Sequence, residues 1–168
     1  MKRFYDWLQK EAVGKKLVKY ISYFILFSYV YGNFVIKMLQ LIGVPLHEQP
    51  HLGIPIASLQ FLILLITTVA IEELLFRGPL IIPILLKWTK RNVLLYALPF
   101  SMVFGLMHGG WANVLVQGAE GLYLCILVLK CGGLQGGHIK GFCVAYTAHL
   151  LFDIAVFALA LLSGQRTI

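Results

Sequence analysis

The sequence predicts an all-α protein, a multi-pass bundle of about five transmembrane helices preceded by a short amphipathic helix. Of its 168 residues, 60% are hydrophobic and only 12% are Asp, Glu, Lys or Arg, about half the charged share of an ordinary soluble domain. The mean hydropathy is +0.84. Long apolar runs without strand-like alternation recur along the chain, so the membrane-spanning elements must be helices. This composition excludes a disordered chain.

The basic residues gather at the ends of the apolar runs. The net charge is +7, and most of the cations form an N-terminal and a central cluster. These clusters are Lys2, Arg3, Lys10, Lys15, Lys16 and Lys19, then Lys87, Lys90 and Arg91. Because cations mark the cytoplasmic side of membrane proteins, we expect a cytoplasmic N-terminus, a cell-membrane location and contact with anionic lipid. We expect no nucleic-acid partner.

The chain divides into a surface helix and a membrane-embedded bundle. Residues 1–16 alternate cations with aromatic and apolar residues, which predicts an amphipathic helix on the inner membrane surface. Residues 17–168 form the bundle. Its first apolar run, 17–43, is long enough to span a hydrocarbon core of about 30 Å. Segment 44–56 has three prolines and no Lys or Arg, which predicts a loop on the outer side.

The second apolar run, 56–86, is too long for one straight span. Gly78, Pro79 and Pro83 interrupt it, which predicts a full span to about Arg77 and then a bent continuation to the central cationic cluster. Four further elements follow. They are a helix over 92–108 that stops at Gly109-Gly110, a linker or re-entrant piece over 111–117, a helix over 118–131 and, after a glycine-rich loop, a last helix over roughly 139–163.

Four of the seven acidic residues lie inside apolar runs. They are Glu72, Glu73, Glu120 and Asp153. A charge at this depth costs several kcal/mol, so each one is a candidate for function. Glu120 stands alone beside Gly118 and Gly121, where it would face a cavity or another helix.

Helical spacing predicts how the other buried polar residues pair. Glu73 and Arg77 are four residues apart, so they share one helix face and can form an ion pair. Glu72 is rotated about 100° from Glu73 and lacks that partner. His149 and Asp153 are also four apart, so Asp153 could orient the imidazole through a ring N–H.

Three roles are open for these residues. An unpaired carboxylate such as Glu72 can act as a general base or acid, or it can bind a metal. Alternatively, the polar groups only hold helices together by hydrogen bonding, or they relay protons in a small carrier.

The depth of the residues in the membrane sets a condition for a shared chemical site. His108 lies seventeen residues beyond Arg91, about 25 Å along a helix. Glu72 reaches that level only if residues 72–87 continue as one helix.

Three motifs resemble those of the CPBP family of intramembrane proteases, the CAAX prenyl-protease and bacteriocin-processing family, also called Abi. Residues 72–77 (EELLFR) match its EExxxR motif, residues 104–108 (FGLMH) match FxxxH, and residues 149–153 (HLLFD) match HxxxN or HxxxD. The order and spacing agree over about residues 56–160.

The resemblance implies an intramembrane endopeptidase that cleaves a peptide or lipidated protein at the membrane. By that resemblance, Glu72 activates the attacking water, Glu73 and Arg77 organise the site, and His108 and His149 polarise the water or stabilise the oxyanion. Asp153 supports His149. Glu72, His108 and His149 also resemble a zinc-hydrolase ligand set, so a zinc-dependent and a metal-free mechanism remain open. The alternative function is a non-catalytic membrane partner, in bacteriocin immunity or sensor-kinase regulation.

Overall fold

The computed structural model describes residues 2–10, 12–44 and 55–164. The described part of the chain is helical and contains no β-strand. Its elements are α1 (Lys2–Gln9), α2 (Lys15–Leu41), α3 (Leu59–Phe76), η1 (Gly78–Leu80), α4 (Ile81–Leu85), α5 (Lys90–Met107), α6 (Trp111–Asn113), η2 (Val114–Gly118), α7 (Ala119–Lys130), η3 (Gly133–Gln135) and α8 (His138–Leu162). Most of the predicted outer loop, residues 45–54, lies outside the described residues.

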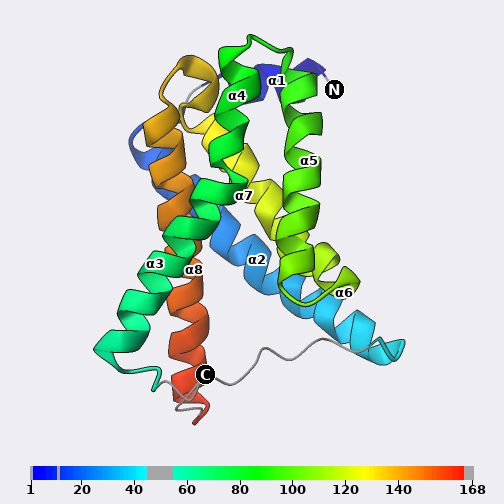
Figure 1. Cartoon of the computed structure of the whole chain (residues 1–168), viewed down its shortest axis with the longest axis vertical. Coiled ribbons are helices and arrows are strands. Elements are labelled where there is room, and N and C mark those ends of the chain that lie inside the picture. The colour runs from blue at the N-terminus through cyan, green and yellow to red at the C-terminus, as the bar shows by residue number, and fades with distance from the viewer. Residues whose placement is uncertain (1, 11, 45–54, 165–168) are drawn as a thin grey trace.

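Successive helices run up and down the bundle, as the all-α membrane prediction requires (Figure 1). Within the described residues, four helical stretches are long and apolar enough to cross a membrane. They are Lys15–Leu41, Leu59–Leu85, Trp111–Gln135 and His138–Leu162. A fifth apolar helix, Asn92–Met107, is shorter. The predicted fold class is therefore confirmed. The connections 86–89 and 131–137 lie at the same end of the bundle as α1 (Figure 1).

The second span bends without reversing. The Ser58 side chain accepts a hydrogen bond from the Phe61 amide at 3.1 Å and starts α3. At Gly78-Pro79 the chain tightens into η1 and then continues as α4 towards the α1 end (Figure 1). A proline at the start of a helical turn is tolerated because its missing N–H would have no partner there. This continuation meets the depth condition, because it keeps Glu72 well inside the span.

Of the two alternatives predicted for 111–117, a linker or a re-entrant piece, the structure contradicts the linker. These residues are helical: α6 leads through η2, a π-helical turn, directly into α7. A Cβ on Gly105 of α5 would lie 2.6 Å from the Val114 Cα and 2.9 Å from the Gly118 nitrogen. Only glycine permits such close contact between two backbones. The contact between Gly105 and this segment cannot be predicted from apolar composition, so 111–117 could not be recognised as part of a packed helix.

The helix α7 forms the centre of the bundle. In its span 56% of the residues are buried, against 22–28% in the other three. At its end, the chain turns through Gly132 (φ +139°) and Gly136 (φ +85°) into α8, and the two helices approach closely at Gly141. A Cβ there would lie 2.4 Å from the Val128 carbonyl oxygen.

The N-terminal helix is shorter than predicted and is held against the bundle. α1 ends at Gln9 rather than near residue 16, and Leu8 is fully buried beside Leu129. The buried Lys130 ammonium donates hydrogen bonds to the carbonyl oxygens of Trp7 and Lys10 and lies 4.6 Å from the Trp7 ring centre. Cations stabilise helix C-termini in this way. α1 therefore packs on the α7–α8 turn in addition to its expected contact with lipid.

We predict that Gly141→Ala destabilises the protein by about 1–3 kcal/mol, the usual cost of overpacking, because its Cβ would collide with backbone. Thermal unfolding in detergent measures the effect. Gly32→Ala is the control, since its Cβ would meet the nearest atom, the Glu120 Oε1, at an ordinary 3.5 Å. Equal unfolding temperatures for the two variants would contradict the close contact between α7 and α8.

Candidate active site

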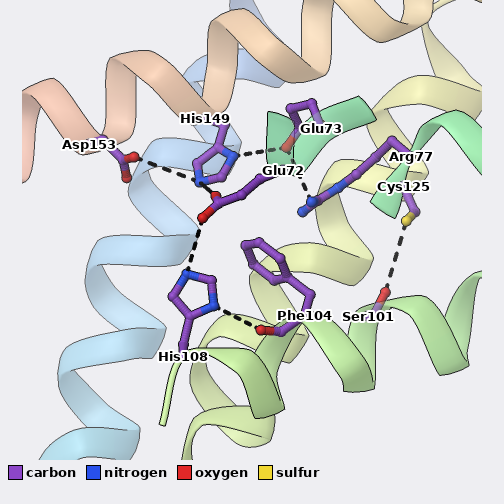
Figure 2. Close-up of polar contacts among 9 residues, drawn as sticks. All are labelled: Glu72, Glu73, Arg77, Ser101, Phe104, His108, Cys125, His149 and Asp153. Atoms are coloured by element: carbon purple, nitrogen blue, oxygen red, sulfur yellow. Dashed lines mark hydrogen bonds and ion pairs between the residues drawn. The ribbon is translucent and has the colours of Figure 1, made fainter. Parts of the chain in front are cut away.

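Three helices bring the residues of the three motifs together (Figure 2). The C-terminal end of α3 supplies Glu72 and Glu73, and Arg77 caps it. The last turn of α5 supplies Phe104, and His108 caps this helix. The middle of α8 supplies His149 and Asp153. The predicted site residues thus converge on one cluster although they are far apart in the sequence.

The base of this cluster is a buried ion pair between Glu73 and Arg77. The side chains of both residues are fully buried, and the Arg77 Nη1 lies 3.3 Å from the Glu73 Oε1, as the i,i+4 spacing predicted. Arginine retains its charge at such depth, so it requires a compensating carboxylate. The ring of Phe104 adds a second contact, with its centre 4.4 Å from the Arg77 Cζ, which is cation–π distance.

Gly121 of α7 makes room for this stack. A Cβ at Gly121 would lie 2.9 Å from the Phe104 Cδ1 and 3.4 Å from the Arg77 Nη2. The same ring also lies 4.5 Å from the His108 ring and 5.9 Å from the His149 ring, centre to centre. Gly121 therefore supports the aromatic contact between the ion pair and both imidazoles. This role of Gly121 could not be predicted, because nothing in the sequence pairs Gly121 with α3 or α5.

His149 is held by Glu73 at one ring nitrogen, and the predicted partner Asp153 lies near the other. The His149 Nδ1 lies 2.8 Å from the Glu73 Oε1. An ionised carboxylate only accepts hydrogen bonds, so the His149 Nδ1 carries a hydrogen and donates the hydrogen bond to Glu73. Asp153 lies on the other side of the ring, with its Oδ2 3.8 Å from Nε2. Helical spacing predicted the contact between His149 and Asp153, whereas the shorter contact, with Glu73, comes from another helix.

His108 is oriented by its own helix. Its Nδ1 lies 2.8 Å from the Phe104 carbonyl oxygen, and because a carbonyl only accepts, Nδ1 is again the donor. That carbonyl is available because the His108 backbone amide bonds to Gly105 instead, at 3.2 Å, as helices often do in their last turn. The Nε2 atom of His108 is thereby directed towards Glu72.

Glu72 lies between the two imidazoles (Figure 2). Its Oε1 is 3.8 Å from the His108 Nε2, and its Oε2 is 3.7 Å from the His149 Nε2. Unlike Glu73, its side chain is 22% exposed. The distances exceed a direct hydrogen bond, and an intervening water or substrate oxygen can bridge such separations. The arrangement can thus present a base and two nitrogen atoms to one bound oxygen.

Glu72, His108 and His149 are the residues that could form a zinc ligand set. Among the described residues, no group of three or more His, Cys, Asp or Glu side chains is placed to hold a metal ion. The mechanism proposed below uses protein groups alone.

Glu120, which the sequence analysis singled out as isolated, lies beside this site. It is buried on α7, with 9% of the residue exposed, and its Oε1 would lie 3.5 Å from a Cβ at Gly32 of α2. In the described part of the chain, no cation forms an ion pair with it. The sequence predicted its burial but could not place it relative to α8.

The comparisons with known proteins agree with the motifs. A family model, described as type II CAAX prenyl endopeptidase Rce1-like, matches residues 54–155. No curated protein matches the chain significantly, and no solved structure does. The matched segment covers more than half of the chain and contains all three motifs, from Glu72 to Asp153. The chain therefore belongs to the Rce1-like family of type II CAAX prenyl endopeptidases.

Proposed function

We propose that this protein is an intramembrane endopeptidase that hydrolyses a peptide bond with a water molecule activated by Glu72. The position of Glu72 between two imidazole Nε2 atoms carries the proposal. Glu72 is the partly exposed carboxylate of the pair 72–73, and the buried Glu73 is committed to Arg77 and His149. The site therefore has one carboxylate free to react and one that is structural.

The first chemical step follows from the donors and acceptors around Glu72. A water between the Glu72 Oε1 and the His108 Nε2 can donate one hydrogen to each, which leaves an oxygen lone pair directed at the substrate carbonyl. Glu72 removes a proton as the C–O bond forms. The negative charge moves to the carbonyl oxygen, and a protonated His149 can stabilise it by donating from Nε2.

The second step breaks the C–N bond. Glu72, now protonated, gives its proton to the leaving nitrogen as the tetrahedral intermediate collapses. The products are a carboxylic acid and an amine, and the water supplies all the atoms they gain. Asp153, 3.8 Å from the His149 Nε2, and Glu73 together balance positive charge on His149. No step requires another reactant.

The substrate class follows from the family and from the depth of the site. The family description names CAAX prenyl endopeptidases, so we infer a peptide or protein substrate presented at the bilayer, with a lipid-modified tail as the first candidate. A leader-bearing precursor peptide is the second. The cationic clusters support a cytoplasmic N-terminus in the cell membrane. No specific observation favours the non-catalytic alternative.

We predict that Glu72→Gln lowers kcat by about 10²–10⁴-fold, the usual contribution of a general base. The assay uses protein in lipid vesicles and a farnesylated peptide ending in a CAAX sequence. Asp6→Asn, the same chemical change on the exposed face of α1, is the control and should retain full activity. A wild-type rate in Glu72→Gln would refute the mechanism, whereas an inactive wild-type protein would refute the substrate class.

We predict that the two neighbouring glutamates respond differently to the same substitution. Glu73→Gln leaves the Arg77 charge buried without its partner, which costs about 3–5 kcal/mol in buried pairs. Its unfolding temperature should therefore fall well below that of Glu72→Gln, which removes a partly exposed charge. Thermal unfolding in detergent measures both variants without any substrate. Equal unfolding temperatures would show that Glu73 and Arg77 are not the structural pair.

A further inference from the structure

Asn113 makes a buried contact with the backbone of His108. Its Nδ2 donates a hydrogen bond of 2.5 Å to the His108 carbonyl oxygen, and only 5% of the residue is exposed. We propose that Asn113 is a positioning residue that holds His108 in the orientation required for hydrolysis. This role rests on the proposed function, although the contact itself does not.

The His108 carbonyl requires such a partner. It belongs to the last turn of α5, whose carbonyls have no amide ahead of them in the helix. After His108 the chain turns through Gly109 (φ +121°) and Gly110 (φ +108°), a backbone that favours glycine. The helical path therefore ends at His108. Asn113 supplies a side-chain donor to this carbonyl.

The position of Asn113 is itself set by close packing. The amide nitrogen of Asn113 bonds to the Gly110 carbonyl at 3.0 Å and closes the turn. On the other side, a Cβ at Gly105 would lie 2.7 Å from the Asn113 carbonyl oxygen. Gly105 belongs to the FxxxH motif. The FxxxH segment thus contains both His108 and the glycine, Gly105, whose missing side chain lets Asn113 approach.

The contact controls which ring nitrogen faces Glu72. The ring of His108 bonds through Nδ1 to the Phe104 carbonyl four residues earlier. That bond exists only while the backbone of His108 stays in the tightened last turn, with its amide on Gly105. Without the Asn113 hydrogen bond, the last turn of α5 would lose a contact that holds it against α6, and the turn could loosen until Nδ1 leaves Phe104. The Nε2 atom would then no longer point at Glu72.

The test compares Asn113→Asp with Gln117→Glu. The first keeps the side-chain shape but places an acceptor where the His108 carbonyl needs a donor. The second makes the same chemical change one turn later in the same helical segment, where the Gln117 Oε1 is buried without a hydrogen-bond partner among the described residues. Asn113→Gln, which keeps an amide donor, is the conservative variant.

We expect Asn113→Asp to lower kcat for the farnesylated peptide by about 10- to 100-fold, the scale of a small misplacement of a catalytic group. KM should stay within about twofold, because the substrate-binding surface is unchanged. Asn113→Gln should retain more activity than Asn113→Asp, and Gln117→Glu should resemble the wild type. Equal losses in Asn113→Asp and Gln117→Glu would overturn the proposal.

A second measurement needs no substrate. In protein labelled with ¹⁵N at histidine, the ring nitrogens of His108 should show one tautomer, with hydrogen on Nδ1, in the wild type and in Gln117→Glu. Asn113→Asp should show a mixture of tautomers. An unchanged His108 spectrum in a folded Asn113→Asp variant would overturn the positioning role. If the wild-type protein cleaves no peptide but Asn113→Asp still changes the His108 spectrum as expected, only the proposed function fails.

Discussion

The buried ion pair between Glu73 and Arg77 is the interaction on which the rest of the site depends. Arg77 cannot lose its charge inside a membrane, so Glu73 must stay ionised beside it. The same Glu73 oxygen accepts the His149 N–H at 2.8 Å, and the same guanidinium lies against Phe104. One structural pair therefore determines the orientation of an imidazole on α8 and of an aromatic ring on α5. Glu72, one residue earlier and about 100° around the helix, remains available for chemistry.

The two adjacent carboxylates have different partners, Arg77 and His149 for Glu73 and the two imidazole Nε2 atoms for Glu72. This explains how a small bundle accommodates several ionisable groups. Arg77 and Glu73 neutralise one another, and they lie behind the groups that we propose to react, Glu72, His108 and His149. The helix α7 provides the support: Gly121 admits the Phe104 ring and the Arg77 guanidinium, and Gly118 brings the helix against the Ser101 backbone. Small residues allow close helix contact in membranes, where lipid gives no hydrophobic drive to association.

The places where sequence-based prediction was wrong or incomplete share a cause. Segment 111–117 was expected to be a linker or a re-entrant piece, because it follows two glycines and is short, yet it is helical and lies against Gly105 of α5. Asp153 was expected to support His149, because the two are four residues apart, and it lies 3.8 Å from Nε2; the direct hydrogen bond, to Nδ1, comes from Glu73 on another helix. In both cases the deciding partner is distant in sequence, and periodicity reports only neighbours on one helix.

The sequence by itself determined that this is a helical membrane protein, roughly where its spans begin and end, and which residues form the three family motifs. Hydropathy and i,i+4 spacing are local properties, so the Glu73–Arg77 pair and the bend at Gly78-Pro79 could be read without a structure. The tertiary structure alone decided that Glu72 stands between two Nε2 atoms, that Glu73 holds His149 and that Asn113 holds His108. These contacts depend on how α3, α5, α7 and α8 pack, and the bilayer leaves buried polar groups few partners other than one another.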